Sequence, residues 1–147
     1  MAVAVEPMQL KDLPEILIIE RLSFPIPWSK QAFLHELNNE FALYLVAREN
    51  LAVCGYIGMW LIVDEGHITN LAVHPAYRRR GIGRLLLKSL IQAGKRYGLR
   101  RLTLEVRRSN LAAQKLYMEF GFTTVGVRSR YYLDNHEDAL IMWKELE

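Results

Sequence analysis

A cluster of arginines and glycines in the middle of the chain is suited to binding an anion. The segment from Arg78 to Arg84 reads Arg-Arg-Arg-Gly-Ile-Gly-Arg and opens a predicted helix. Its glycines, Gly81 and Gly83, let backbone approach a ligand, while the helix dipole favours negative charge and the arginines supply charge-assisted hydrogen bonds. A pyrophosphate fits this description. The alternative is a basic helix start with solvated arginines.

Two further residues have side chains suited to proton transfer. Glu105 lies in a predicted strand on the face opposite Leu102 and Leu104, and a carboxylate there could act as a general base. Tyr117 carries a phenol, whose ordinary pKa near 10 keeps it protonated at neutral pH and able to donate a proton to a leaving group. The alternatives are a glutamate in an ion pair and a tyrosine in the core.

The elements that must position these residues follow from hydrophobic periodicity and capping. Asp12 is placed to cap a first helix, Ser29 a second and Asn110 a fourth that ends at Gly121. Two prolines keep the segment 24–28 extended. A long amphipathic helix is predicted from Ile82 to Tyr97. Strands are predicted at 41–48, 51–63, 67–73, 101–106, 124–132 and 139–144.

The predicted elements of residues 67–106 form a strand–helix–strand crossover. Such crossovers are right-handed and pair parallel strands, so the ends of the strands 67–73 and 101–106 lie at one edge of the sheet, where ligands bind in open α/β sheets. We predict an α/β (mixed α+β) fold, with a mixed central sheet of about six to seven strands and helices on both faces. The 147 residues, 51% of them hydrophobic, predict one domain over 1–147.

Several classes of protein are disfavoured by the same sequence. The longest apolar stretch, 51–63, is interrupted by Gly55 and Gly58, and the first residues do not resemble a secretory signal, so we expect a cytoplasmic protein without a membrane partner. A net charge of +3 argues against a nucleic-acid partner. We expect a monomer. Cys54, among apolar neighbours, is predicted to be a buried thiol.

No metal site is expected, because the four histidines are far apart in sequence and from Cys54. Either His67 or His74 could still tune the chemistry at the ligand edge. The four histidines are His35, His67, His74 and His136.

The pattern Arg78-x-x-Gly81-x-Gly83, after Asn70-Leu-Ala-Val-His-Pro75, resembles the acetyl-CoA loop of the GCN5-related N-acetyltransferase (GNAT) superfamily. This resemblance implies the GNAT fold and acetyl-CoA as the acetyl donor. It also implies that the strand before the loop contacts the pantetheine arm and that the loop holds the pyrophosphate. The residues concerned are Leu71, Ala72 and Val73 for the arm, and Arg78, Arg79, Arg80, Gly81, Ile82, Gly83 and Arg84 for the pyrophosphate.

More narrowly, segments along nearly the whole chain resemble the ribosomal-protein-alanine N-acetyltransferase (RimI) group. They are 24–29, 104–107, 109–113, 116–117, 121–122, 130–132 and 137–139. By this resemblance Glu105 is the general base, Tyr117 the general acid and Asn110 a cofactor contact, and Trp28, Tyr131 and Tyr132 wall the peptide slot. Leu133 and Asp134 depart from the group, whose better-known bacterial members carry proline there, and this affects the shape of the substrate-side loop.

The resemblance implies transfer of acetyl from acetyl-CoA to the N-terminal amine of a protein, with the N-terminal alanine of a small-subunit ribosomal protein as acceptor. An α-amine has a pKa of about 7.7–8.0 against about 10.4 for lysine, so its deprotonation costs roughly 3.4 kcal/mol less. Basic ribosomal tails would favour acids at the peptide entrance, for which Glu36, Glu40, Glu137 and Asp138 are the candidates. The alternatives are transfer to lysine or a small amine, and a non-catalytic module that binds CoA or RNA.

Overall fold

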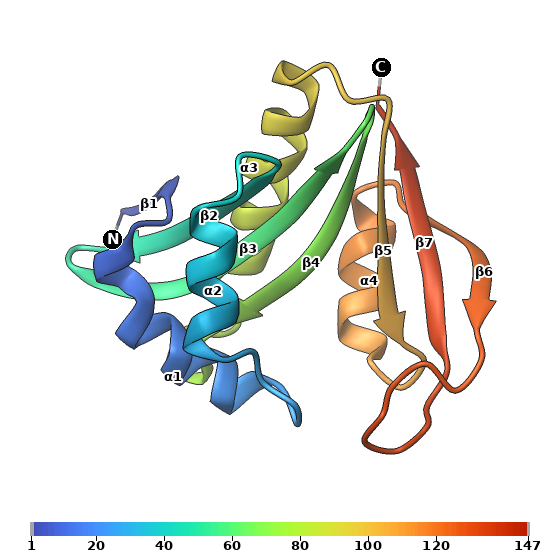
Figure 1. Ribbon diagram of the computed structural model, residues 1–147, viewed down its shortest axis with the longest axis horizontal. Coiled ribbons are helices and arrows are strands. Elements are labelled where there is room, and N and C mark those ends of the chain that lie inside the picture. The colour runs from blue at the N-terminus through green and yellow to red at the C-terminus, as the bar shows by residue number, and fades with distance from the viewer. Residues whose placement is uncertain (1, 147) are drawn as a thin grey trace.

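The computed structural model describes residues 2–146, which form one mixed sheet of seven strands with helices on both faces (Figure 1). The strand order is β1-β2-β3-β4-β5-β7-β6. The strands are β1 (Val3–Pro7), β2 (Ala42–Glu49), β3 (Ala52–Ile62), β4 (Glu65–Val73), β5 (Arg101–Arg107), β6 (Thr123–Arg128) and β7 (Ala139–Glu145). The helices are α1 (Leu13–Ser23), α2 (Lys30–Leu37), α3 (Ile82–Arg96) and α4 (Leu111–Glu119). The predicted fold class is confirmed.

The sheet separates two hydrophobic cores. Helices α3 and α4 cover one face, where Leu86 and Leu90 of α3 pack with Leu102 of β5 and are fully buried. Helices α1 and α2 cover the other face, where Ile16 and Phe33 are fully buried. The apolar stripes of the helices therefore meet the sheet on both sides, as their helical periodicity requires.

Strands β4 and β5 begin as a parallel pair and then separate (Figure 1). Their pairing covers Glu65 to His67 on β4 and Arg101 to Thr103 on β5. Just beyond, Thr69 is an extra residue in the pairing of β4 with β3. This bulge turns Ala72 toward the core beneath α1, while Leu71 and Val73 pack in the core beneath α3. Beyond His67, the β5-facing edge of β4 is therefore left without a strand partner in the described residues.

Three details of the predicted elements were wrong. Strand β1 was missed, because five residues beside a proline carry little pattern of their own and depend on pairing with β2. Asp12 precedes α1, but its side chain does not cap the helix and instead binds Arg48 through both oxygens. Strand β6 ends at Arg128, so Tyr131 and Tyr132 lie in the following loop.

None of the helices within residues 2–146 combines the length and apolarity needed to cross a lipid bilayer. Cys54 is fully buried, as predicted.

Candidate active site

A cavity of about 360 Å³ lies where β4 ends and α3 and α4 begin. Gly81 occupies the N-cap position of α3 with a φ of +78°, which favours glycine because it has no Cβ. The first backbone N–H groups of α3 have no partner within the helix and face its N-terminal end. The lining residues are Val73, Tyr77, Arg78, Arg79, Gly81, Ile82, Gly83, Arg84, Ala112 and Leu116. The predicted anion loop thus forms one wall of a cavity.

The four arginines of this loop have different surroundings. Arg78 donates from Nε to the Val73 carbonyl at 3.1 Å, and Arg84 pairs with Glu119. Arg79 lines the cavity with a φ of +64°. Arg80 does not line the cavity, because its guanidinium pairs with the buried Glu49 at 2.6 Å. Arg78, Arg79 and Arg84 therefore line the cavity, Arg78 and Arg84 with protein partners of their own, whereas Arg80 anchors the loop to β2.

The other residues predicted to contact acetyl-CoA also differ in whether they line the cavity. Val73 lines the cavity, but Leu71 and Ala72 do not. The Asn110 side chain accepts a hydrogen bond from the Ala113 N–H at 3.1 Å and so caps α4. Sequence reasoning missed Tyr77, Ala112 and Leu116 as lining residues, although Ala112 and Leu116 share a face of α4 at helical spacing.

Glu105 stands on β5 at the point where β4 and β5 separate. Its side chain is only 13% exposed, and its Oε1 lies 2.7 Å from His67 Nε2 on β4. Arg128 of β6 is 3.5 Å from the other carboxylate oxygen. The hydrogen bond from His67 is the main reason that the pKa of Glu105 is lowered, with burial opposing it and the charges of His67 and Arg128 adding to it. The carboxylate is therefore ionised at neutral pH.

The contact between His67 and Glu105 shows that His67, rather than His74, meets the predicted base. The signal in the sequence was their shared position in the crossover, since His67 pairs with Thr103 and Glu105 lies two residues further on the same face. His74 accepts from the Ala76 N–H instead.

Tyr117, on α4, is 6% exposed and is not among the residues that line the cavity. Its ring packs against Phe122 with centroids 5.5 Å apart. Burial raises the pKa of the Tyr117 phenol, and the neighbouring Tyr132 adds to this effect. Burial also raises the pKa of Tyr132 to about 12, and the charge of Glu105 contributes, while Arg107 opposes the rise. Both phenols are therefore protonated at neutral pH.

Trp28 has a packing role in addition to its predicted place in the peptide slot. Its ring lies 5.3 Å from Phe33 and 6.3 Å from Tyr44, measured between centroids. Its backbone N–H donates to the buried Glu20 at 2.8 Å, and burial raises the pKa of Glu20. Since Glu20 also accepts from the Tyr56 hydroxyl, the segment 24–28 is tied to the core beneath α1.

Three of the four acids predicted at the peptide entrance have partners within the protein. Glu137 binds Arg107, and Asp138 lies 3.6 Å from the Arg108 guanidinium. Glu36 is 8% exposed and accepts from Asn39. The fourth, Glu40, is exposed, and its role at the entrance stays a prediction.

Comparison with known proteins shows what this arrangement belongs to. Residues 13–122 match the sequence profile described as the acetyltransferase (GNAT) family. The chain belongs to the GNAT family. It is an acetyl-CoA-dependent N-acetyltransferase, as its relatives also indicate.

Two curated relatives cover nearly the whole chain. A Bacillus subtilis protein named "Putative ribosomal protein bS18-alanine N-acetyltransferase" is 46% identical over 141 residues, which are 95% of this chain and 93% of the relative. The ribosomal protein bS18-alanine N-acetyltransferase of Escherichia coli K12 is 35% identical over 137 residues, or 92% of each chain.

A solved structure agrees with these relatives. The crystal structure of the Escherichia coli ribosomal-protein-S18-alanine N-acetyltransferase superimposes with a TM-score of 0.92 at 34% identity, and covers 99% of this chain and 95% of that one. This GNAT chain therefore shares both sequence and fold with enzymes of that name.

The cavity residues fit acetyl-CoA, the donor that the family uses. Its pyrophosphate needs cations and free N–H groups: three arginines line the cavity, of which Arg84 would have to share its guanidinium with Glu119, and the start of α3 supplies the N–H groups. The unpaired edge of β4 offers backbone groups to an amide-containing arm such as pantetheine. Among residues 2–146, no group of three or more His, Cys, Asp or Glu is arranged to hold a metal ion.

Proposed function

We propose that this enzyme acetylates the N-terminal amine of a protein, and that its acceptor is the N-terminal alanine of a small-subunit ribosomal protein. The observation that carries the proposal is the Glu105–His67 pair, which lies 2.7 Å apart at the point where β4 and β5 separate. The names of the two relatives support the choice of acceptor.

In this proposal, Glu105 receives the proton of the attacking amine through a water molecule. A neutral amine is the nucleophile, and an α-amine is about 2.5 pKa units easier to deprotonate than lysine. Because the pKa of Glu105 is lowered, the carboxylate is a modest base, which suits an α-amine better than a lysine. The amine nitrogen bonds to the acetyl carbon, and backbone N–H groups of β4 near Leu71 and Val73 stabilise the oxyanion.

Tyr117 completes the reaction as general acid. The carbon–sulfur bond breaks as the tetrahedral intermediate collapses, and the phenol gives its proton to the CoA thiolate. The raised pKa of Tyr117 keeps the phenol protonated at neutral pH, so that its proton is present when the carbon–sulfur bond breaks and negative charge develops on the sulfur. Solvent then restores the phenol, and Glu105 loses the amine's proton to water, so both groups return to their starting states.

Mass spectrometry tests this function directly. The enzyme is incubated with acetyl-CoA and two peptides that begin Ala-Arg and contain an internal lysine, one with a free and one with a blocked N-terminus. We expect acetyl only on the free α-amine. Acetyl on lysine in both peptides would instead show a lysine acetyltransferase. No transfer to either peptide, or to polyamines, would contradict acyl transfer to amines and direct attention to a CoA- or RNA-binding role.

A further inference from the structure

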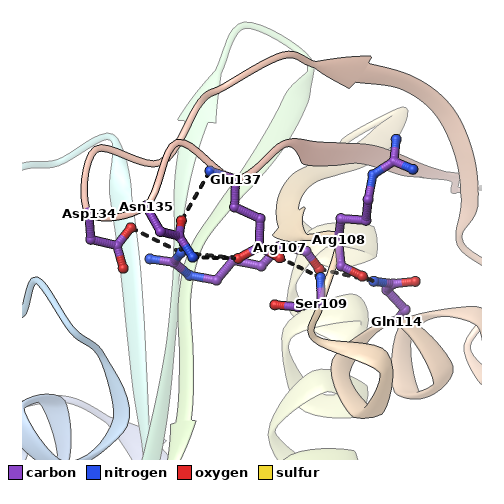
Figure 2. Close-up of polar contacts among 7 residues, drawn as sticks. All are labelled: Arg107, Arg108, Ser109, Gln114, Asp134, Asn135 and Glu137. Carbon is purple, nitrogen blue, oxygen red and sulfur yellow. Dashed lines mark hydrogen bonds and ion pairs between the residues drawn. The ribbon is translucent and has the colours of Figure 1, made fainter.

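The guanidinium of Arg107, the last residue of β5, forms hydrogen bonds with the loop that connects β6 to β7 (Figure 2). Its Nη1 donates to Asp134 at 3.1 Å, to Asn135 at 3.4 Å and to Glu137 at 3.4 Å. These three acceptors lie within four consecutive positions of the loop. The Arg107 side chain is 20% exposed, so most of its surface is in contact with protein.

The flat face of the same guanidinium covers an aromatic ring. The Cζ atom of Arg107 lies 4.0 Å from the centroid of Tyr132. A planar cation can stack on a ring while its edge donates hydrogen bonds, and this combination is specific to arginine among the basic residues. Arg107 therefore contacts three polar side chains of the loop and the face of the Tyr132 ring.

The loop is closed on itself around these contacts. Tyr132 donates its N–H to the Glu137 carbonyl at 3.2 Å, and Glu137 accepts from the Ser109 N–H through its carboxylate. Hydrogen bonds from Ser109, Asn135 and Arg107 lower the pKa of Glu137 to about 2, so the carboxylate that accepts them is ionised at neutral pH.

The segment at the end of β5, Arg107 and Arg108, also contacts α4, the helix that carries Tyr117. The side-chain N–H groups of Gln114 donate to the carbonyls of Arg107 and Arg108, each at 2.9 Å (Figure 2). Since Glu105 precedes Arg107 by two residues on the same face of β5, one short segment connects the base strand, the α4 helix and the loop that carries Tyr132.

We propose that Arg107 is a positioning residue for the acceptor: it stacks on Tyr132 and anchors Asp134 and Glu137, and so holds the Tyr132 ring as a wall of the peptide site beside Glu105. This inference rests on the proposed N-terminal transfer. Asp134, one of the two residues that depart from the better-known bacterial pattern, supplies a charged anchor for the loop.

Steady-state kinetics with a peptide bearing a free N-terminal alanine test this role. Arg107→Met should raise the peptide KM about tenfold and leave the KM for acetyl-CoA within about twofold, because the variant misplaces the acceptor wall and not the donor cavity. Arg107→Lys should behave like Arg107→Met, since an ammonium group has no planar face to stack. Asp134→Asn, which leaves Arg107 in place, should raise the peptide KM about twofold to threefold.

The matched control is Arg108→Met, since Arg108 is the next residue, is 59% exposed and makes only a 3.6 Å ion pair. Its peptide KM should match that of the parent protein. A double-mutant cycle adds Tyr132→Leu. If Arg107 acts through Tyr132, Arg107→Met should have little further effect in the Tyr132→Leu background. Fully additive effects, or an unchanged peptide KM in Arg107→Met, would overturn the proposal.

A readout independent of activity separates this inference from the proposed function. The protein is labelled with 3-fluorotyrosine, and Tyr132→Phe identifies the Tyr132 signal among its seven tyrosines by ¹⁹F NMR. Arg107→Met should shift that signal, whereas Arg108→Met should leave it in place. An unmoved signal in folded Arg107→Met overturns the role of Arg107 alone. Failure of the parent protein to acetylate the peptide overturns the proposed function, whatever the NMR result.

Discussion

The donor cavity and the acceptor side of the site draw their residues from the chain in different ways. Eight of the ten residues that line the donor cavity lie between Val73 and Arg84. On the acceptor side, Glu105 comes from β5, His67 from β4, Arg128 from β6 and Tyr132 from a loop. One half is a local segment of chain, and the other is assembled by the sheet.

This difference follows from what each half must bind. A pyrophosphate is recognised by free N–H groups and positive charge, which one loop and one helix start can supply. Proton transfer and peptide positioning depend on the electrostatics of individual side chains, and the state of Glu105 is set by groups 38 and 23 positions away in sequence, at His67 and Arg128. Single substitutions in the acceptor half should therefore mainly lower kcat, whereas substitutions in the donor half should mainly raise the KM for acetyl-CoA.

The largest effect is expected at the base. Glu105→Gln keeps the shape of the side chain but removes its charge, and should lower kcat by about 10²–10⁴ with little change in the KM for acetyl-CoA. Stopped assays of thiol release measure this. Glu65→Gln is the control, because Glu65 is the first residue of β4 and pairs with Arg101 and not with Glu105 or His67. Unchanged turnover in Glu105→Gln would remove it from the mechanism.

In the donor half, substitutions of the neighbouring Arg79 and Arg80 should affect the KM for acetyl-CoA differently. Arg79→Gln should raise the KM for acetyl-CoA about tenfold by removing a charge-assisted contact with the pyrophosphate. Arg80→Gln should change that KM by less than about twofold but lower the thermal midpoint, because Glu49 loses its partner while buried. Equal increases in KM for both variants would show that the loop rearranges on binding and presents Arg80 as well.

The pH profile tests how the tertiary partners set the base. His67 lowers the pKa of Glu105, so the carboxylate stays ionised down to acidic pH, and its protonation forms an acidic limb well below the pH of about 8 at which protonation of the acceptor amine already reduces activity. His67→Ala removes the largest cause of the shift, so the acidic limb of kcat/KM should move to higher pH. His35→Ala, on the exposed surface of α2, is the control. If the acidic limb does not move, it does not report the ionisation of Glu105.

The smallest effect is expected at the boundary between the two halves. Asn110 caps α4, so Asn110→Ala should lower the free energy of unfolding by about 1 kcal/mol, as measured by urea denaturation. The KM for acetyl-CoA should change by less than about twofold. A large rise in that KM without a loss of stability would instead support the cofactor contact implied by the family resemblance.

Much of the architecture could be predicted because each element depends on residues that are close together in the sequence. The alternation in β5, the apolar stripe of α3 and the cap at Ser29 each depend on neighbours within a few positions. The arginine-glycine loop is local in the same sense, since Gly81 needs only a positive φ to start the helix. The family resemblance added the roles of Glu105 and Tyr117, which remain predictions.

Other features were decided only by tertiary contacts, because charged side chains choose partners by distance in space and not in sequence. Asp12 was expected to cap a helix, but Arg48 of β2 offered two stronger charge-assisted hydrogen bonds. Arg80 was expected to face the pyrophosphate, but the sheet places the buried Glu49 beside it. The sequence by itself therefore determined the order of elements and the local anion loop. The tertiary structure decided which of its many charges remain free to bind a ligand.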